Sequence, residues 1–288
     1  MQVLGTYDAK RRNYLVMKKL LVMLLVIGMV AGILVGCASD QPAANLTDGV
    51  EVENTDNAGD AGDAKVWKIA TDTVFRPFEY TDETGAFVGI DVDILAAIAA
   101  DQGFEYELNS PGWDASIAAC QSGQANGMIA GASITDERKE SGWIFSDGYY
   151  TATQCMAVAA NSDIASFDDL AGKTVAVKTG TQGAAYAESL KDEYGFNLTY
   201  FEDSPTMYQA VVGGQAVACF EDTPIISDYI VSQGLAAKVV EGSENEGAPY
   251  GFAIFNEENQ ELLDMFNAGL KNIQANGVYD EIISKYLG

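Results

Sequence analysis

The sequence predicts an α/β chain with mainly parallel sheets. From Val66 onward, short apolar runs alternate with segments of helical periodicity, which is the pattern of sheets connected by helices. Several helical segments end at a glycine, which readily terminates a helix, namely Gly103, Gly123, Gly195, Gly213 and Gly234. Hydrophobic residues make up 48% of the 288 positions, so the chain can bury the core of one large domain or of two ordinary ones.

The predicted strands are short apolar runs, and the predicted helices carry apolar residues at a spacing of three or four. Strands are expected at residues 66–71, 104–108, 127–130, 155–159, 174–177, 198–201, 216–220, 238–240 and 250–255. Helices are expected at residues 91–102, 114–122, 135–140, 182–194, 205–212, 224–233, 258–276 and 278–286. This alternation can form one sheet or two lobes.

Residues 1–36 have the features of a lipoprotein signal peptide. Two lysines precede the apolar run 20–35, which is shorter than the about twenty residues of a membrane helix and fits a signal peptide. Small residues precede Cys37, as in a bacterial lipobox, so we expect cleavage before Cys37 and a lipid on it. The alternative for the run is a buried core helix, and Met17 is an alternative start. The protein is therefore expected on the extracellular face of the bacterial cytoplasmic membrane.

Residues 37–65 are predicted to form a flexible tether between the lipid and the folded part, because they are acidic and rich in small residues. Their aspartates lack the spacing of a calcium loop. Beyond Cys37 three cysteines remain, without a CxxC spacing, and neither a zinc site nor a disulfide scaffold is expected. Cys120, Cys155 and Cys219 are expected as buried thiols, and the alternative is a disulfide between the last two.

The charge and the missing residue types limit the function. Residues 1–36 carry five Lys or Arg and one Asp, so removing them changes the net charge from −26 to −30. Such a charge argues against nucleic acid and anionic membrane surfaces as partners. Histidine is absent, which excludes imidazole metal sites and the commonest general base. We therefore expect a binding protein rather than an enzyme, with no metal and no cofactor.

Charged and aromatic residues follow the predicted strands, where ligands bind in open α/β sheets. They are Asp72, Phe75, Trp113, Gly131, Ser133, Arg138, Lys178, Thr181, Gln182, Glu221 and Asp222. This set can hold a free amino acid. Arg138 can bind the α-carboxylate, helped by Ser133 and by the backbone N–H groups of Thr181 and Gln182. Asp222 can accept from the ammonium, with the Gly131 carbonyl as a second acceptor, while aromatic rings enclose the stem.

Arg138 is in an unusual place for a cation. It is the third residue of a helix predicted to begin after Thr135, where the helix dipole repels positive charge by roughly 0.3–1 kcal/mol. One interpretation is a solvated side chain that leans on Asp136 or Glu137. The other is that an anion from elsewhere docks there.

Seven spaced motifs extend the pattern: TDTVFRPFEY, VGIDVDILAAIA, GWDASIAACQSG, GASITDERKES, FSDGYY, DLAGKTVAVKTGTQG and EDTPI. With these motifs in the same order, residues 67–287 resemble the extracellular solute-binding proteins of polar amino-acid ABC importers, solute-binding protein family 3. The likeness is greatest to glutamine-binding members. Their pattern of Asp, Phe, aromatic, Gly, Ser or Thr, Arg, Lys and Asp is similar to Asp72, Phe75, Trp113, Gly131, Ser133, Arg138, Lys178 and Asp222.

The resemblance implies a two-lobed, periplasmic-binding-protein-like (type II) fold with a hinge of two crossing segments. Lobe 1 would be residues 66–148 plus 252–288, lobe 2 residues 153–246, and the hinge residues 149–154 and 247–252. It also implies a monomer that captures an L-amino acid by closure of the lobes. The partners would be the permease subunits of an ABC transporter.

The sequence departs from the glutamine-binding pattern at Glu221, where those members have His, and at Gln182, where they have Gly. Asp72 and Lys178 offer an acceptor and a donor, which suit a carboxamide, so glutamine is expected first. A cationic amino acid is second, if Glu221 pairs with Lys178, and glutamate is third. Cyclohexadienyl dehydratases are similar to this family and use an acidic residue, so an enzyme is a remote alternative with Glu221 facing the cleft.

Overall fold

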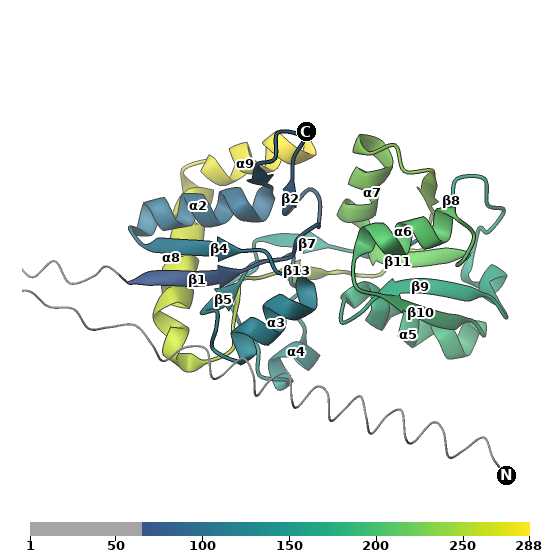
Figure 1. The fold of residues 1–288 in the computed structure, drawn as a ribbon, viewed down its shortest axis with the longest axis horizontal. Helices are drawn as coiled ribbons and strands as arrows, with labels where there is room; N and C mark the ends of the chain where they lie inside the picture. The colour runs from purple at the N-terminus through teal and green to yellow at the C-terminus, as the bar shows by residue number, and fades with distance from the viewer. Residues whose placement is uncertain (1–64) are drawn as a thin grey trace, which may run out of the picture. The chain divides into compact units, whose positions relative to one another are not determined.

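A computed structural model describes residues 65–288, and Figure 1 shows two separate sheets within this part of the chain. The predicted signal peptide, the lipidation site Cys37 and the tether up to residue 64 lie outside the described residues. Each sheet has five strands and is covered by helices. We call the parts built on the two sheets lobe 1 and lobe 2. The predicted α/β class is confirmed.

Lobe 1 is built on a sheet with the strand order β4-β1-β5-β14-β6. The strands are β1 (Val66–Ala70), β4 (Glu105–Asn109), β5 (Gly127–Met128), β6 (Ile144–Phe145) and β14 (Ala253–Ile254). Strand β1 is parallel to β4 and β5, whereas β14 is antiparallel to β5 and β6. A hairpin of β2 (Tyr80–Thr81) and β3 (Phe87–Val88) precedes the first helix of this lobe.

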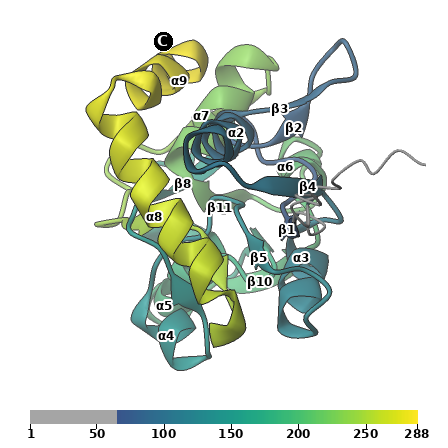
Figure 2. The same cartoon turned by 90° about the vertical axis from the view of Figure 1, so that its left-hand side faces the viewer.

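Five helices belong to lobe 1: α2 (Ile90–Gln102), α3 (Trp113–Gln121), α4 (Asp136–Glu140), α8 (Gln260–Ala275) and α9 (Val278–Leu287). Helix α8, from the end of the chain, packs against α2 (Figure 2). The two helices approach closely because Gly269 has no side chain, and a Cβ there would lie 2.8 Å from Cγ2 of Ile98. On the sheet side, Phe266 of α8 stacks on Phe252, with ring centroids 4.7 Å apart.

Lobe 2 is built on a sheet with the strand order β10-β9-β11-β8-β12. The strands are β8 (Gln154–Ala159), β9 (Thr174–Lys178), β10 (Asn197–Phe201), β11 (Ala218–Asp222) and β12 (Ala237–Val239). The helices are α5 (Gln182–Tyr194), α6 (Ser204–Val212) and α7 (Thr223–Ser232), with a 3₁₀ turn η1 at Phe167–Leu170. Helix α5 lies close to β11 because Gly183 in its first turn would, with a Cβ, come 2.7 Å from the Phe220 carbonyl oxygen.

Two strands join the lobes. The chain leaves lobe 1 through β7 (Tyr150–Ala152) and returns through β13 (Ala248–Tyr250), and the two strands pair antiparallel with Tyr250 opposite Tyr150. In Figure 1 they lie between the two five-stranded sheets. The last part of the chain therefore completes lobe 1 by adding β14, α8 and α9.

The sheets are mixed rather than mainly parallel, since each has parallel pairings on one side and antiparallel pairings on the other. The segment predicted as one strand, 250–255, is divided between β13 and β14. The division lies at Gly251 and Phe252, because the Gly251 amide donates to the Ala132 carbonyl and the Phe252 amide donates to the Ser146 hydroxyl, and neither bond pairs two strands. Predicted helix 258–276 begins as a 3₁₀ turn, η2 (Glu257–Asn259), before α8. The short strands β2, β3, β6 and β7 were not predicted, because two or three residues carry no recognisable period.

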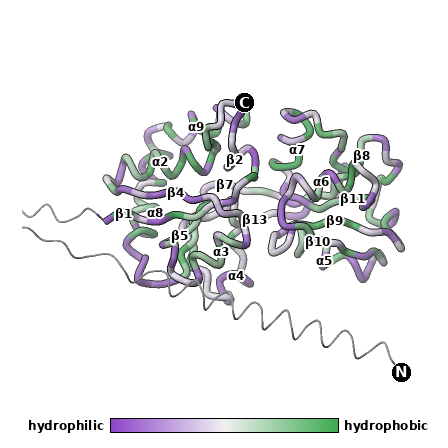
Figure 3. Tube along the Cα trace, viewed as in Figure 1, coloured by the Kyte–Doolittle hydropathy of each residue, from purple (hydrophilic) through white to green (hydrophobic). Residues whose placement is uncertain are grey.

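The distribution of hydropathy follows burial in the sheets. Figure 3 shows β4 mainly hydrophilic, as expected for the edge strand of lobe 1, whose sequence EYELN leaves every second side chain exposed. It shows α7 mainly hydrophobic, and this helix buries Ile225, Ile226 and Tyr229 against lobe 2. Some of the polar residues that remain buried lie at the ends of inner strands, among them Asp72, Lys178 and Asp222.

Candidate functional site

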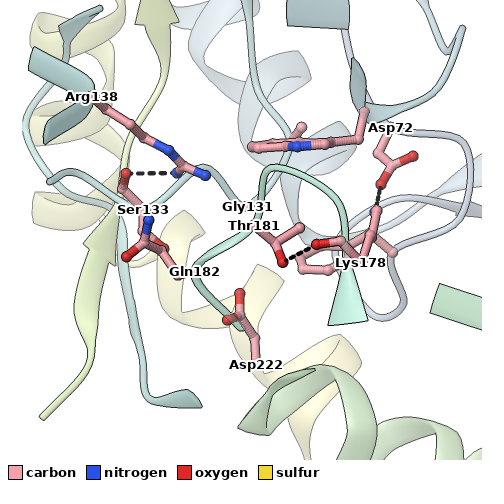
Figure 4. A pocket seen from close by; sticks show the side chains of 11 residues that line it. Asp72, Gly131, Ser133, Arg138, Lys178, Thr181, Gln182 and Asp222 are labelled. Carbon is pink, nitrogen blue, oxygen red and sulfur yellow. Dashed lines mark hydrogen bonds and ion pairs between the residues drawn. The ribbon is translucent and has the colours of Figure 1, made fainter. Parts of the chain in front are cut away.

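One cavity brings together residues from both lobes. It is lined by Asp72, Phe75, Trp113, Ala130, Gly131, Ser133, Arg138, Lys178, Thr181, Gln182 and Asp222 (Figure 4). All of the predicted ligand-contact residues except Glu221 are in this lining, and Ala130 was not predicted. The empty space among these side chains, including the part open to solvent, is about 270 Å³. The cavity is therefore small, and residues of both lobes enclose it.

The cavity lies at the carboxyl ends of parallel strands. Asp72 follows β1 by two residues, Gly131 follows β5 by three, and Lys178 and Asp222 are the last residues of β9 and β11. Strands β9 and β11 are parallel, so their final residues point to the same edge of the sheet. The topology therefore delivers polar side chains from four strands to one place.

Arg138 is held inside the cavity and not in solvent. Its backbone N–H donates to Oγ1 of Thr135, the N-cap of α4, at 3.2 Å. Its guanidinium donates from Nη1 to the Ser133 carbonyl at 2.8 Å and from Nη2 to the Gly180 carbonyl of lobe 2 at 3.2 Å. Only 8% of the residue is exposed, so the interpretation of a solvated Arg138 is wrong.

The Arg138 charge has no carboxylate within 4 Å among the residues that the structure describes. Burial lowers its pKa to about 10, which the more distant negative charge of Asp222 partly opposes, so the side chain stays cationic at neutral pH. The rings of Trp113 and Trp143 lie 5.1 and 5.0 Å from its central carbon. A buried cation paired only with carbonyls is well placed to accept an anion.

Asp222 reaches the cavity from β11 with its carboxylate already oriented. Nε2 of Gln154 donates to Oδ1 at 2.6 Å, and the Tyr250 hydroxyl donates to Oδ2. Burial, and then the charge of Glu221, raise the pKa of Asp222 to about 7, while the hydrogen bonds from Tyr250 and Gln154 and the charge of Arg138 oppose the rise. A bound ammonium group would restore the charged form.

Asp72 and Lys178 form an ion pair that joins the lobes. Lys178 Nζ donates to Oδ2 of Asp72, while the Thr73 amide donates to Oδ1 at 2.7 Å. Lys178 is only 2% exposed. Burial would lower its pKa, but the negative charges of Asp72 and Glu221 outweigh this and the pKa is raised. Lys178 is thus charged and donates to Asp72, a pairing that the sequence did not predict.

Aromatic rings and a glycine shape the rest of the cavity. Lys178 Nζ lies 5.1 Å from the ring centroid of Phe75 and 5.9 Å from that of Trp113. The indole N–H of Trp113 is buried and has no hydrogen-bond partner among the described residues, so it is a free donor at the wall. Gly131 has φ +55°, and a Cβ there would lie 2.5 Å from Phe75 Cε1. Both facts require glycine at this point.

Helix α5 points its N-terminus at the cavity. Thr181 is its N-cap, and Oγ1 of Thr181 accepts from the Ala184 amide at 3.2 Å and donates to the Lys178 carbonyl at 2.8 Å. In the part of the chain that the structure describes, the amides of Thr181 and Gln182 donate to no acceptor. They remain available for a negatively charged group.

Glu221 does not line the cavity, so the prediction that it faces the cleft is wrong. Its Oε2 accepts from the hydroxyls of Ser204 at 2.6 Å and Tyr208 at 2.9 Å, and its Oε1 accepts from the Asp222 amide. The residue is 1% exposed. Consecutive residues of a strand point to opposite faces, so Glu221 turns toward α6 while Asp222 enters the cavity.

Two residues that orient Asp222 were not predicted as part of a site. Gln154 and Tyr250 lie where the crossing segments were expected, so sequence analysis assigned them to a hinge and not to binding. Cys120, Cys155 and Cys219 are free and buried, and the alternative of a disulfide between the last two is not observed. Within residues 65–288 there is no cluster of side chains suited to a metal ion, and none of the helices is long and apolar enough to span a membrane.

Comparisons with known proteins agree on one family. Residues 67–288 match the family described as bacterial extracellular solute-binding proteins, family 3. An arginine-binding extracellular protein of Bacillus subtilis, ArtP, is 30% identical over 245 residues, which are 85% of this chain and 94% of that protein. A solved ancestral arginine-binding protein bound to arginine is 33% identical and superposes with a TM-score of 0.71, covering 77% of this chain and 98% of that one. Substrate binding domain 2 of GlnP from Lactococcus lactis, solved in an open conformation, is 40% identical with a TM-score of 0.54, covering 77% and 94%.

Proposed function

Because the chain belongs to the bacterial extracellular solute-binding proteins of family 3, we propose that it captures one free polar amino acid, L-glutamine first, for an ABC importer. The observation that carries this proposal is the pair of Arg138 and Asp222 in one small cavity. Arg138 is a buried cation that pairs with no carboxylate of residues 65–288, and Asp222 is a buried acid that lines the same cavity. An α-carboxylate and an α-ammonium satisfy both groups at once.

The backbone of the ligand would be held at these two residues. The α-carboxylate would bind to the Arg138 guanidinium and the free amides of Thr181 and Gln182, near the side chain of Ser133. The ammonium would donate to Asp222 and to the Gly131 carbonyl. Phe75 and Trp113 would enclose the aliphatic stem.

The ligand's side chain would extend toward the Asp72–Lys178 pair. This pair is neutral as a whole, so a neutral carboxamide can accept from Lys178 and donate to Asp72 without leaving a buried net charge. Glutamate would face Asp72, and a cationic side chain would face Lys178. Glu221, which could have freed Asp72 by pairing with Lys178, is instead bound to Ser204 and Tyr208. This geometry favours glutamine.

A cationic amino acid is the second candidate. Two of the relatives described above are named as arginine-binding, and Asp72 is a carboxylate that an arginine side chain could reach if Lys178 moved aside. A dehydratase is the remote alternative, and it is weakened because Glu221, the acid proposed for it, lies outside the cavity. We therefore propose a binding protein and not an enzyme.

The ligand would be captured by closure of the lobes about residues 149–154 and 247–252. Arg138 already donates to Gly180 and Lys178 to Asp72 across the lobes, as expected for a closed form. The TM-score supports this interpretation, because it is higher with the arginine-bound protein than with the open domain, although the open domain is more similar in sequence. The protein would act as a monomer at the outer face of the membrane, anchored by a lipid on Cys37, and would deliver the amino acid to a permease.

Side-by-side titration calorimetry with glutamine, arginine, lysine, histidine and glutamate tests the ligand. We expect the tightest binding for glutamine. Tight arginine binding with no glutamine heat would establish the second candidate in its place. If none of these amino acids binds while prephenate or arogenate is turned over, the enzyme alternative holds.

A further inference from the structure

Two carboxyl groups are buried near each other in lobe 1, outside the ligand cavity: the Asp91 amide donates at 3.0 Å to the carbonyl of Phe78, the residue before Glu79. Glu79 follows the loop that carries Phe75, and Asp91 is the second residue of α2. Neither is exposed to solvent at all. Three of their four oxygen atoms, both of Glu79 and Oδ1 of Asp91, have no hydrogen-bond donor among the described residues. No Lys or Arg of this part of the chain forms an ion pair with either residue.

The fourth oxygen, Oδ2 of Asp91, accepts two hydrogen bonds. One comes from the backbone N–H of Gly131 at 2.8 Å, and the other from the hydroxyl of Tyr149 at 2.9 Å. Gly131 lines the ligand cavity, and Tyr149 immediately precedes the connecting strand β7. Asp91 therefore holds one residue of the site and one residue of the connection between the lobes.

Two adjacent buried carboxylates without a cation are unstable, because both lose hydration and repel each other. A single proton between them removes half of the charge and supplies the missing hydrogen bond. We propose that Glu79 carries this proton and donates it to Asp91, and that Asp91 thereby positions Gly131 and Tyr149 for ligand binding. The part about ligand binding rests on the proposed function, whereas the shared proton does not.

The titration behaviour agrees with this assignment. Burial, and then the charges of Asp91 and Asp72, raise the pKa of Glu79 well above its ordinary value, and the more distant Lys178 lowers it only partly. Burial raises the pKa of Asp91 to about 7, while the hydrogen bonds from Gly131 and Tyr149 oppose the rise. Because Asp91 accepts these two hydrogen bonds and Glu79 accepts none from the described residues, the proton is favoured on Glu79. The other titratable groups that face the pair are the hydroxyls of Tyr149 and Tyr279, whose raised pKa values keep them neutral.

The shared proton is tested by infrared spectroscopy and thermal unfolding without ligand. At about pH 8 the wild type should show the C=O band of a protonated carboxylic acid, and E79Q should lack it, while D222N should keep it as the control for the other buried acid. Because the pKa of Glu79 is raised in the folded state, its contribution to stability is full at low pH and is lost as pH rises through the raised pKa. The wild-type Tm should therefore fall over this range, and E79Q should lose this part of the fall. An unchanged band in E79Q, or identical pH profiles of Tm, would overturn the shared proton.

The positioning role is tested by calorimetry with glutamine. E79Q keeps a donor to Asp91, so we expect its affinity at about pH 8 to stay within threefold of wild type and to decline less at higher pH. D91N should lose about tenfold in affinity, since Gly131 and Tyr149 lose their charged acceptor. Y149F, which removes one hydroxyl, should give a smaller loss and serves if D91N does not fold. Wild-type affinity in both D91N and Y149F would overturn positioning, whereas a wild type that binds no amino acid would overturn the proposed function and leave the infrared result standing.

Discussion

Arg138 is a buried cation that lacks a carboxylate partner among residues 65–288. It stands at the N-terminal end of α4, where the dipole opposes it, and within the described residues its guanidinium lies against carbonyl oxygens and indole rings. Asp222 is the acid that complements this cation. Its neighbours Gln154 and Tyr250 orient the carboxyl group by hydrogen bonds but carry no positive charge that could pair with it. Each of these residues has a consequence that can be measured.

The first prediction concerns Arg138→Ala. The variant should lose the charge-assisted pair with the α-carboxylate, at a cost of about 2–5 kcal/mol, and should show no calorimetric binding of glutamine at concentrations that saturate the wild type. Lys139→Ala is the matched control, because Lys139 is the neighbouring cation on α4 and its side chain is 52% exposed. Binding by Arg138→Ala within threefold of wild type would show that the carboxylate is held elsewhere.

The second prediction concerns pH. The pKa of Asp222 is raised to about 7, so a ligand ammonium must displace its proton in more acidic solution. Affinity should be full above pH 7 and should fall by about tenfold per pH unit below it. The raised pKa has the opposite effect on the empty protein, whose stability from this group is present at low pH and is lost as pH rises through 7. Calorimetry and Tm measured from pH 5 to 8, with Asp222→Asn as the reference, would reveal these opposite trends, and parallel trends would contradict the role of Asp222.

Helices and strands could be predicted where neighbouring residues in the sequence determine where they begin and end. Helix 182–194 has both predicted ends, since Thr181 caps its start and Gly195 ends it in the left-handed conformation. The hairpin near Asp82 was missed because its strands have only two residues, and it depends on Asp82 Oδ1 accepting from the Thr84 and Ala86 amides. The strand order could not be predicted from the strands themselves. Strand β14 lies between β5 and β6, and its two residues carry no feature that indicates this place, which depends on the packing of α8 that follows it.

Most of the residues of the candidate site could also be predicted from the sequence. Residues that follow strands meet at the carboxyl ends of the sheets, which is a general property of the fold, and all but Glu221 of the predicted residues line the cavity. Which of two adjacent residues faces inward depends on strand register, and this decided between Glu221 and Asp222. Which charges pair depends on contacts between residues far apart in sequence, and this joined Asp72 to Lys178.

The third prediction concerns an ion pair between the two lobes that lies outside the cavity. Nε of Arg76, in the loop after β1, donates to Oδ2 of Asp228 on α7 at 3.1 Å, and the two side chains are 21% and 15% exposed. The pair joins the lobes without touching the cavity lining, so it should stabilise the closed form. Because it is partly solvated, we expect about 1 kcal/mol, or roughly a fivefold loss of glutamine affinity, in Asp228→Asn, and a smaller loss at high salt.

The control for this prediction lies within lobe 1. Lys271 and Asp147 form an ion pair at 3.6 Å that does not cross between the lobes. Asp147→Asn removes the same charge as Asp228→Asn, so it should leave affinity unchanged. A double variant of Arg76 and Asp228 should lose no more than the single variants. Equal losses from Asp147→Asn would mean that net charge, and not the contact between the lobes, sets the affinity.

At the scale of the whole molecule, the described part is two sheets joined by β7 and β13. Connections of this kind allow two rigid lobes to rotate about a few residues while each core stays packed. The contacts between the lobes described above, Arg138–Gly180, Lys178–Asp72 and Arg76–Asp228, would then break on opening.

The fourth prediction is that saturating glutamine reduces the radius of gyration. Small-angle scattering of the folded part with and without ligand measures this directly. The residues before the first strand should be removed for the experiment, so that only residues 65–288 contribute. Identical profiles, together with heat of binding, would place the ligand within one lobe or would mean that the empty protein is already closed.

The separation between the Arg138–Asp222 pair and the Asp72–Lys178 pair has an evolutionary consequence. The first pair would recognise what all amino acids have in common, and the second what distinguishes them. Under the proposed function, mutation at Lys178 would therefore alter which nutrient is imported while the recognition of the common part stayed intact. A bacterium that acquires a second copy of such a gene would then need few substitutions to exploit a new nitrogen source, since the scaffold, the proposed closure and the proposed permease contact would all be inherited unchanged.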